Sequence, residues 1–206
     1  MKLKNTFIAA TMVGVAMLAP MAHANELNTD TIKVTTGHAS SMASTTLNVT
    51  FEQLEDSTGL VYMGGLVSKE ALLPYLAQMK ALEPWQFEAL RNGQKTRDHN
   101  KFHITLINPY EYKELSTEQQ GQLKLKSEQS IEFSLIGLGR VIKKVKADGS
   151  EKNGVTYFVV AESEGAQALR TSFGFKEKDF HATLGFSPSD IFGVRKDRSA
   201  LIHQGK

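Results

Sequence analysis

The amino-acid sequence predicts an α+β fold: duplicated strand–helix–strand lobes, with mainly antiparallel sheets, facing a central cleft. The pentapeptide Phe-His-x-Thr-Leu occurs at 102–106 and again at 180–184. A β-rich segment and then a helical pattern precede each copy, beginning at 60–67 in the first half and at 155–161 in the second. Hydrophobic residues make up 41% of the 206 residues and charged residues 22%, which is typical of a globular domain with its own core.

The first unit opens with the largely apolar segment 60–67, which is typical of a buried strand. Ser68 is the expected N-cap of a helix over 69–92, in which leucines, a tyrosine and a methionine keep helical spacing. Pro84 is expected to break or kink this helix and leave a second short helical piece. The polar stretch 91–100 predicts a loop that leads into the first motif strand.

The second unit is reached through the polar segment 111–130, which predicts a short helix after Ser116. Apolar or alternating residues at 131–142 and 155–161 predict two strands, and the Asp-Gly and Asn-Gly pairs between them predict a hairpin turn. A helix over 164–173 then precedes the second motif strand. The order of elements therefore repeats that of the first unit.

The first 24 residues resemble an export signal, and we expect it to be cleaved. Lys2 and Lys4 give a positive start, 7–18 is a short apolar run, and Ala22-His23-Ala24 gives the small-x-small pattern before a cleavage site. A retained membrane anchor is the alternative, but the apolar run is short for a span of roughly 20 residues. No other segment is long and apolar enough to span a membrane, so we expect no membrane association after cleavage.

The cleaved chain would comprise a Ser/Thr-rich arm at 25–58, either an added edge strand or a loose segment, and a bilobal domain at 59–206. The formal charge of +2 is too small to indicate a general nucleic-acid binder, and loss of Lys2 and Lys4 would remove it. The absence of cysteine excludes disulfides, thiolate nucleophiles and cysteine metal sites. An exported chain without disulfides fits a bacterial periplasm, although secretion further out is also compatible.

The doubled motif supplies chemistry for displacement at phosphorus. Because side chains alternate along a strand, His103 and Thr105 share one face of the first strand, and His181 and Thr183 share one face of the second. One neutral histidine can take a proton from the attacking oxygen, and the other, protonated, can donate to the leaving oxygen. The threonine hydroxyls can bind phosphate oxygens. This mechanism needs no metal and no cofactor.

A single copy of the motif is more typical of a core histidine than of a site. At this chain's own residue frequencies, however, roughly 0.003 copies of Phe-His-x-Thr-Leu are expected by chance. Two copies on equivalent strands therefore indicate a functional site.

The two His-x-Thr motifs on duplicated lobes resemble those of the 2H phosphoesterase superfamily. The tail FHATLGFSPSDIFGVRKDRSALI is most similar to the RNA-repair-like subgroup called Swiss Army Knife 2H phosphoesterases. Phe192 stands in a segment where that subgroup often has a histidine. The resemblance implies a metal-independent enzyme that opens or forms cyclic phosphate esters, typically 2′,3′-cyclic phosphates on nucleotides or RNA ends. By motif match, His103 and His181 become the acid/base pair, in an order left open, and Thr105 and Thr183 the phosphate binders.

Four further residues are candidates for substrate contacts. Tyr110 and Tyr112 follow the first motif strand and could stack on a base, although packing is the alternative for at least one of them. Arg195 and Lys196 belong to a basic run after the second motif, which is either a solvated face or a groove edge that attracts phosphates. His99 and His103 are four apart, but four strand residues span roughly 13 Å, so they do not predict a shared metal.

The sequence thus predicts an exported phosphodiesterase for 2′,3′-cyclic nucleotides or short RNA-like substrates. The alternative from another class is a non-catalytic periplasmic protein that keeps the cleft to bind a nucleotide or phosphorylated ligand. Both alternatives share the four motif residues. The natural substrate and the oligomeric state do not follow from the sequence.

Overall fold

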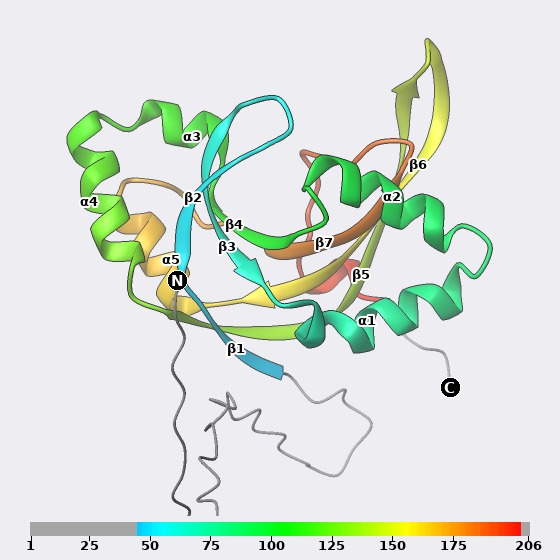
Figure 1. The fold of residues 1–206 in the computed structure, drawn as a ribbon, viewed down its shortest axis with the longest axis horizontal. Helices are drawn as coiled ribbons and strands as arrows, with labels where there is room; N and C mark the ends of the chain where they lie inside the picture. The colour runs from blue at the N-terminus through cyan, green and yellow to red at the C-terminus, as the bar shows by residue number, and fades with distance from the viewer. Residues whose placement is uncertain (1–44, 203–206) are drawn as a thin grey trace, which may run out of the picture. The chain divides into compact units, whose positions relative to one another are not determined.

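The computed structural model describes residues 45–202, and the predicted export signal and the start of the arm lie outside them (Figure 1). The described chain forms one seven-stranded sheet in the order β1-β5-β6-β7-β4-β3-β2 with five α-helices, and every strand pairing is antiparallel. The strands are β1 (Thr45–Val49), β2 (Phe51–Glu55), β3 (Val61–Val67), β4 (Phe102–Ile107), β5 (Ile131–Ala147), β6 (Ser150–Glu162) and β7 (Phe180–Ser187). The helices are α1 (Lys69–Leu82), α2 (Phe87–Arg97), α3 (Pro109–Glu114), α4 (Thr117–Ser127) and α5 (Glu164–Ser172). The predicted α+β, antiparallel class is confirmed.

The predicted duplication takes the form β3-α1-α2-β4 and β6-α5-β7, each a pair of adjacent strands joined through helices. The two units meet where β4 pairs with β7, at Ile104 opposite Ala182. They share one continuous sheet, so the two motif strands lie next to each other at its centre.

Both units carry the same backbone irregularity. In the first, the register between β3 and β4 shifts beside Leu106. In the second, the register between β6 and β7 shifts beside Leu184. A β-bulge therefore falls on the leucine of each Phe-His-x-Thr-Leu copy, which places the duplication in the backbone as well as in the sequence.

The sheet curls strongly, because its two outer strands are consecutive in the chain. β1 pairs with β5 and β2 pairs with β3 at the opposite end of the strand order, yet only Thr50 separates β1 from β2. The rings of Phe51 in β2 and Phe133 in β5 are accordingly 5.8 Å apart. The end of the predicted arm thus contributes an edge strand at each end of the sheet, one of the two outcomes that the sequence left open.

The core lies on the face of the motif strands opposite the His/Thr pairs. It includes Phe102, Ile104 and Leu106 from β4 and their counterparts in β7, all buried. The helices are exchanged between the units: α1 packs on β5 and β6, α2 packs on β7, and α5 packs on β4. Each half therefore completes the core of the other.

The helical prediction for the first unit needs correction. The helix α1 ends at Leu82 as Pro84 suggested, but the stretch from Arg91 to Arg97, predicted as a loop, continues α2. The sequence there is polar, and tertiary bonds compensate: the buried Gln94 amide donates to the Lys101 carbonyl oxygen at 2.6 Å. No helix within residues 45–202 is long and apolar enough to cross a membrane.

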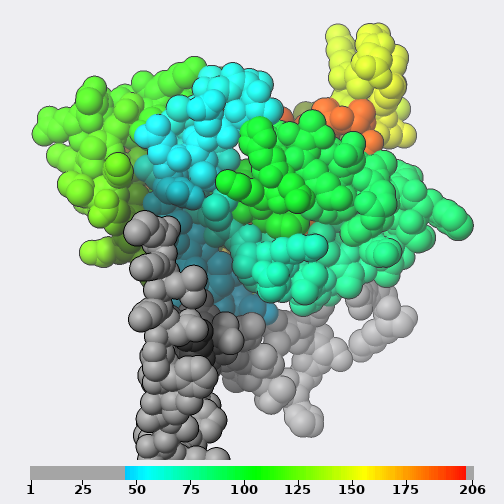
Figure 2. Space-filling view, viewed as in Figure 1, coloured from blue at the N-terminus to red at the C-terminus, as the bar shows by residue number. Residues whose placement is uncertain are grey.

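The strands β5 and β6 run further than predicted. Beyond the last pairing of β6 with β7 at Val155, residues 143–154 pair only with each other across the turn. Figure 2 shows the tip of this hairpin standing out from the surface.

Candidate active site

The four motif side chains form a compact group on β4 and β7. Because Ile104 is opposite Ala182 in an antiparallel pair, His103 is set beside Thr183 and Thr105 beside His181. Directly opposite Cβ atoms in such pairs are about 4.5–5.5 Å apart and diagonal ones about 7–8 Å. The two histidines therefore occupy one diagonal and the two threonines the other.

An aromatic ring stands beside each histidine. The Tyr62 ring of β3 lies 5.3 Å from the His103 ring, and the Phe158 ring of β6 lies 5.6 Å from the His181 ring. Tyr62 reaches across Gly64, where an added Cβ would lie 2.8 Å from the tyrosine ring. These rings limit the orientations that the imidazoles can adopt.

The tautomer of neutral His181 follows from its hydrogen bond. Its Nδ1 lies 3.0 Å from the Asp179 carbonyl oxygen, which can only accept, so Nδ1 carries the hydrogen. The Nε2 atom is then left with a lone pair, as a proton acceptor requires. Burial lowers the pKa of His181, and the charge of Lys196 lowers it further.

His103 has a different electrostatic setting. Burial lowers its pKa most, the carboxylate of Asp98 acts in the opposite direction, and the charge of Arg97 lowers the pKa further. The neighbouring Tyr62 is also affected, because burial first and the charge of Asp98 second raise the pKa of its phenol to about 12. Tyr62 is therefore a hydrogen-bond donor at neutral pH.

A buried charged cluster flanks the group, and sequence reasoning missed most of it. The Asp190 carboxylate accepts hydrogen bonds from Arg97 of α2, from the Thr156 hydroxyl at 2.9 Å and from the Lys196 ammonium at 3.3 Å. Burial alone would raise the pKa of Asp190, but Lys196 and Arg97 hold it below its ordinary value. The cluster ties the tail after β7 to α2 and β6. The only signal in the sequence was the tail itself, since Arg97 fell in the predicted loop.

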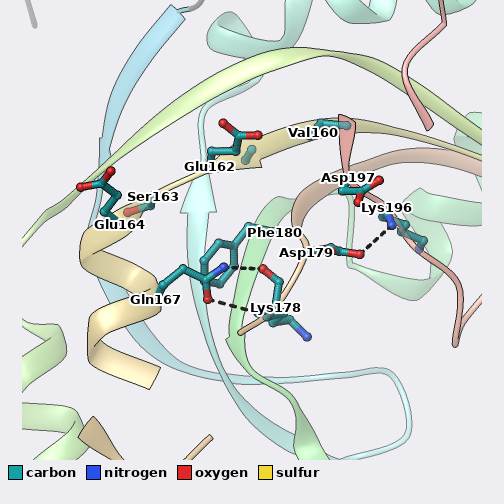
Figure 3. Close-up of a pocket in the computed structure, with 11 residues that line it drawn as sticks. Val160, Glu162, Ser163, Glu164, Gln167, Lys178, Asp179, Phe180, Lys196 and Asp197 are labelled. Atoms are coloured by element: carbon teal, nitrogen blue, oxygen red, sulfur yellow. Dashed lines mark hydrogen bonds between the residues drawn. The ribbon is translucent and has the colours of Figure 1, made fainter. Parts of the chain in front are cut away.

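A pocket of about 280 Å³ opens at the end of β6, and the residues that line it do not include the four motif residues. It lies between the end of β6, the start of α5, the segment before β7 and the tail, and its lining includes Val160, Lys178, Asp179 and Lys196 (Figure 3). Val160 is the β6 partner of His181 in the sheet, so the pocket adjoins the motif strands. It offers room for part of a ligand beyond the motif residues.

The four predicted substrate contacts separate into two groups. Tyr112 is buried in the core with its hydroxyl 3.3 Å from the Gln53 amide oxygen, so the structure does not bring it to the site, and Tyr110 is exposed on α3. Arg195 is exposed and paired with Asp179, whereas Lys196 is buried beside the motif strands. Of the four, Lys196 is integrated into the site.

The arrangement suits attack in line with a departing oxygen. Two imidazoles on opposite corners can serve opposite sides of one phosphorus, and the Thr105 and Thr183 hydroxyls on the remaining corners can donate to its other oxygens. Each histidine lies on the same strand face as the threonine two residues later, as strand alternation in the sequence predicts.

Comparison with known families agrees with this geometry. The family model of the Swiss Army Knife 2H phosphoesterase domain matches residues 69–192, a range that contains both motif strands and the Asp190 carboxylate. Neither the curated proteins nor the solved structures give a significant match to the chain. The match covers more than half of the chain, and it supports phosphoesterase activity in general. The protein therefore belongs to the Swiss Army Knife family of 2H phosphoesterases.

Proposed function

We propose that this protein is an exported phosphodiesterase that hydrolyses cyclic phosphate esters, on 2′,3′-cyclic nucleotides or RNA ends, by acid/base catalysis with two histidines. The diagonal placement of His103 and His181 on paired strands carries the proposal. One imidazole accepts a proton from water while the water oxygen bonds to phosphorus. The other, protonated, donates to the ribose oxygen as the ring P–O bond breaks, and no metal takes part. A phosphomonoester and a free hydroxyl result.

The test is turnover of 2′,3′-cyclic nucleotides by purified residues 25–206 in EDTA. We expect His103→Asn and His181→Asn each to reduce kcat/KM by about 10²–10⁴-fold, the contribution typical of general acid–base catalysis. His99→Asn is the matched control, because His99 is exposed, lies outside the motifs and has a positive φ that asparagine tolerates. Loss of activity in EDTA would refute the metal-free mechanism. Binding of the nucleotides without turnover would instead identify a non-catalytic binding protein.

Export is the second part of the proposal, and it rests on the positive start, apolar run and small-x-small pattern of residues 1–24. In a bacterial host, the intact mass of the periplasmic product should correspond to a chain that begins at Asn25. An uncleaved product retained in the cytoplasm would contradict export but leave the chemistry untouched. Outside the cytoplasm, scavenging of cyclic nucleotides or RNA fragments is a better fit than RNA repair.

A further inference from the structure

Lys196 is a buried ammonium that the reaction proposed above does not use. Its residue surface is only 4% exposed, and its Nζ lies 5.5 Å from the Phe158 ring centroid and 5.7 Å from that of Phe192. Lysine is rarely buried to this extent unless it is paired, because desolvation of the ammonium is costly. Burial lowers the pKa of Lys196, and its pairing partner, the Asp190 carboxylate, opposes this and fixes the ammonium in place.

The partner is itself held by several elements of the fold. Asp190 is bonded by Arg97 from α2 and by Thr156 from β6, and Arg97 is bonded in turn to Asp98. These bonds fix the position of the Asp190 carboxylate, and the carboxylate in turn fixes the position of the Lys196 ammonium. Lys196 is therefore anchored from the α2 and β6 side of the site.

Lys196 and His181 contact the same aromatic ring. The Phe158 ring is 5.6 Å from the His181 ring, at an angle of 68°, and 5.5 Å from the Lys196 ammonium. Figure 3 shows Lys196 at the pocket, with its backbone N–H bonded to the carboxylate of Asp179, two residues before His181. An apolar ring and a buried setting screen charge far less than water does, so the Lys196 ammonium acts on the His181 imidazole across the Phe158 ring.

The charges that face His181 are unequal in sign. Burial lowers the pKa of His181 most and the charge of Lys196 comes second; Lys178, from the segment before β7, acts in the same direction. The Asp179 carbonyl and the Asp190 carboxylate oppose them. On the flanking strands, β6 contributes the uncharged Phe158 and Val160, whereas β4 contributes Thr105 and, on the diagonal, the titratable His103. Among the positive charges that lower the pKa of His181, Lys196 therefore has the largest effect.

We propose that Lys196 is a positioning residue whose fixed charge keeps the His181 imidazole unprotonated and so reserves the proton-acceptor role for it. His103 faces the Asp98 carboxylate, which counteracts the lowering of its pKa by burial and by Arg97, and it takes the remaining role of proton donor. The division of roles rests on the proposed function, whereas the action of Lys196 on His181 does not.

The direct test is an NMR titration of the histidine side chains in the full mature chain, with the His181 signal assigned by its loss in His181→Asn. Lys196→Met should shift the His181 titration to higher pH, and Lys196→Arg, which keeps the charge, should leave it near the original position. Lys152→Met is the control for loss of a lysine, because Lys152 lies on the exposed hairpin tip. An unchanged or lower His181 titration in folded Lys196→Met overturns the proposal.

A measurement on the unchanged protein covers the case in which Lys196→Met does not fold. When Lys196 loses its proton at alkaline pH, the His181 nitrogen resonances should show a second inflection at the pH where the Lys196 side-chain signal moves. Absence of that inflection also overturns the proposal. With active enzyme, the acidic limb of the kcat/KM profile should move to higher pH in Lys196→Met. If the protein shows no turnover, only the proposed function is refuted. The titrations still decide whether Lys196 acts on His181.

Discussion

The two motif histidines should make the fold sensitive to mild acid. The pKa of His103 and the pKa of His181 are both lowered in the folded protein, by burial first. In the unfolded chain they take up protons near their ordinary pKa of about 6.5. Just below that pH the unfolded state therefore binds more protons than the folded state, and the free energy of unfolding falls as the pH falls.

We expect the urea midpoint to be lower at pH 5.5 than at pH 7.5. In a His103→Asn/His181→Asn double variant the difference between the two pH values should shrink. Carboxylates with lowered pKa, such as Asp190, lose their stabilising effect only at more acidic pH and do not confound this window. A midpoint that is the same or higher at pH 5.5 would contradict the lowered pKa of the two motif histidines in the folded protein.

At the scale of single residues, the sequence predicted the part of the site that is local. His103 and Thr105 share a face because strand alternation depends only on their spacing. The salt bridges that join Asp190 to Arg97 and Lys196 could not be predicted in the same way. Ninety-three positions separate Asp190 from Arg97, and no periodicity connects a helix end with a tail loop.

At the scale of elements, each motif bulge is held by an arginine from the other unit. Arg170 of α5 donates to the Leu106 carbonyl oxygen at 2.6 Å, and Arg91 of α2 donates to the Leu184 carbonyl oxygen. Both arginines are buried, and Arg170 also pairs with Glu111 at 2.7 Å. The exchanged helices therefore fix the backbone just after each motif threonine.

Arg170→Met should cost about 3–5 kcal/mol of stability, since it leaves the partly buried Glu111 carboxylate and the Leu106 carbonyl without their partner. The free energy of unfolding in urea measures this. Arg198→Met is the control, because the Arg198–Glu162 pair is exposed and such pairs contribute about 0–1 kcal/mol. Equal losses for both variants would show that the buried arginine has no special role at the bulge.

Element boundaries were predicted well where capping and apolar spacing agree. Ser68 caps α1 as expected, accepting from the Ala71 N–H at 3.2 Å. The prediction was wrong from Arg91 to Arg97, because helical structure there depends on burial of Arg91 and Gln94 against distant strands. Tertiary contacts of this kind leave no local pattern in a polar stretch.

At the scale of the whole described fold, closure of the sheet depends on Gly65. A Cβ at this position would lie 2.1 Å from the Val49 side chain and 3.1 Å from the Thr50 carbonyl oxygen. The connection from β1 to β2 thus passes directly over β3. Only a residue without a side chain allows the chain to pass this close.

Gly65→Ala should therefore destabilise the protein by about 1–3 kcal/mol, as overpacking in a core does. The matched control is Gly121→Ala in α4, where an added Cβ meets nothing within 4 Å and alanine favours the helix by roughly 0.5–1 kcal/mol. Urea unfolding of the two variants should move in opposite directions. A neutral Gly65→Ala would mean that the crossing over β3 is looser than described.

The junction at Thr50 also has a consequence for the order in which the chain folds. The strand β1 is synthesised early, but its partner in the described sheet, β5, begins at Ile131. Contacts so distant in sequence form late, because a long loop must close before any pairing compensates its entropy. The units around the two motifs can assemble from shorter-range contacts within β3–β4 and β6–β7. Joining the two edges through one residue therefore makes the docking of β1 on β5 the closing step of folding, taken only after most of the chain has emerged.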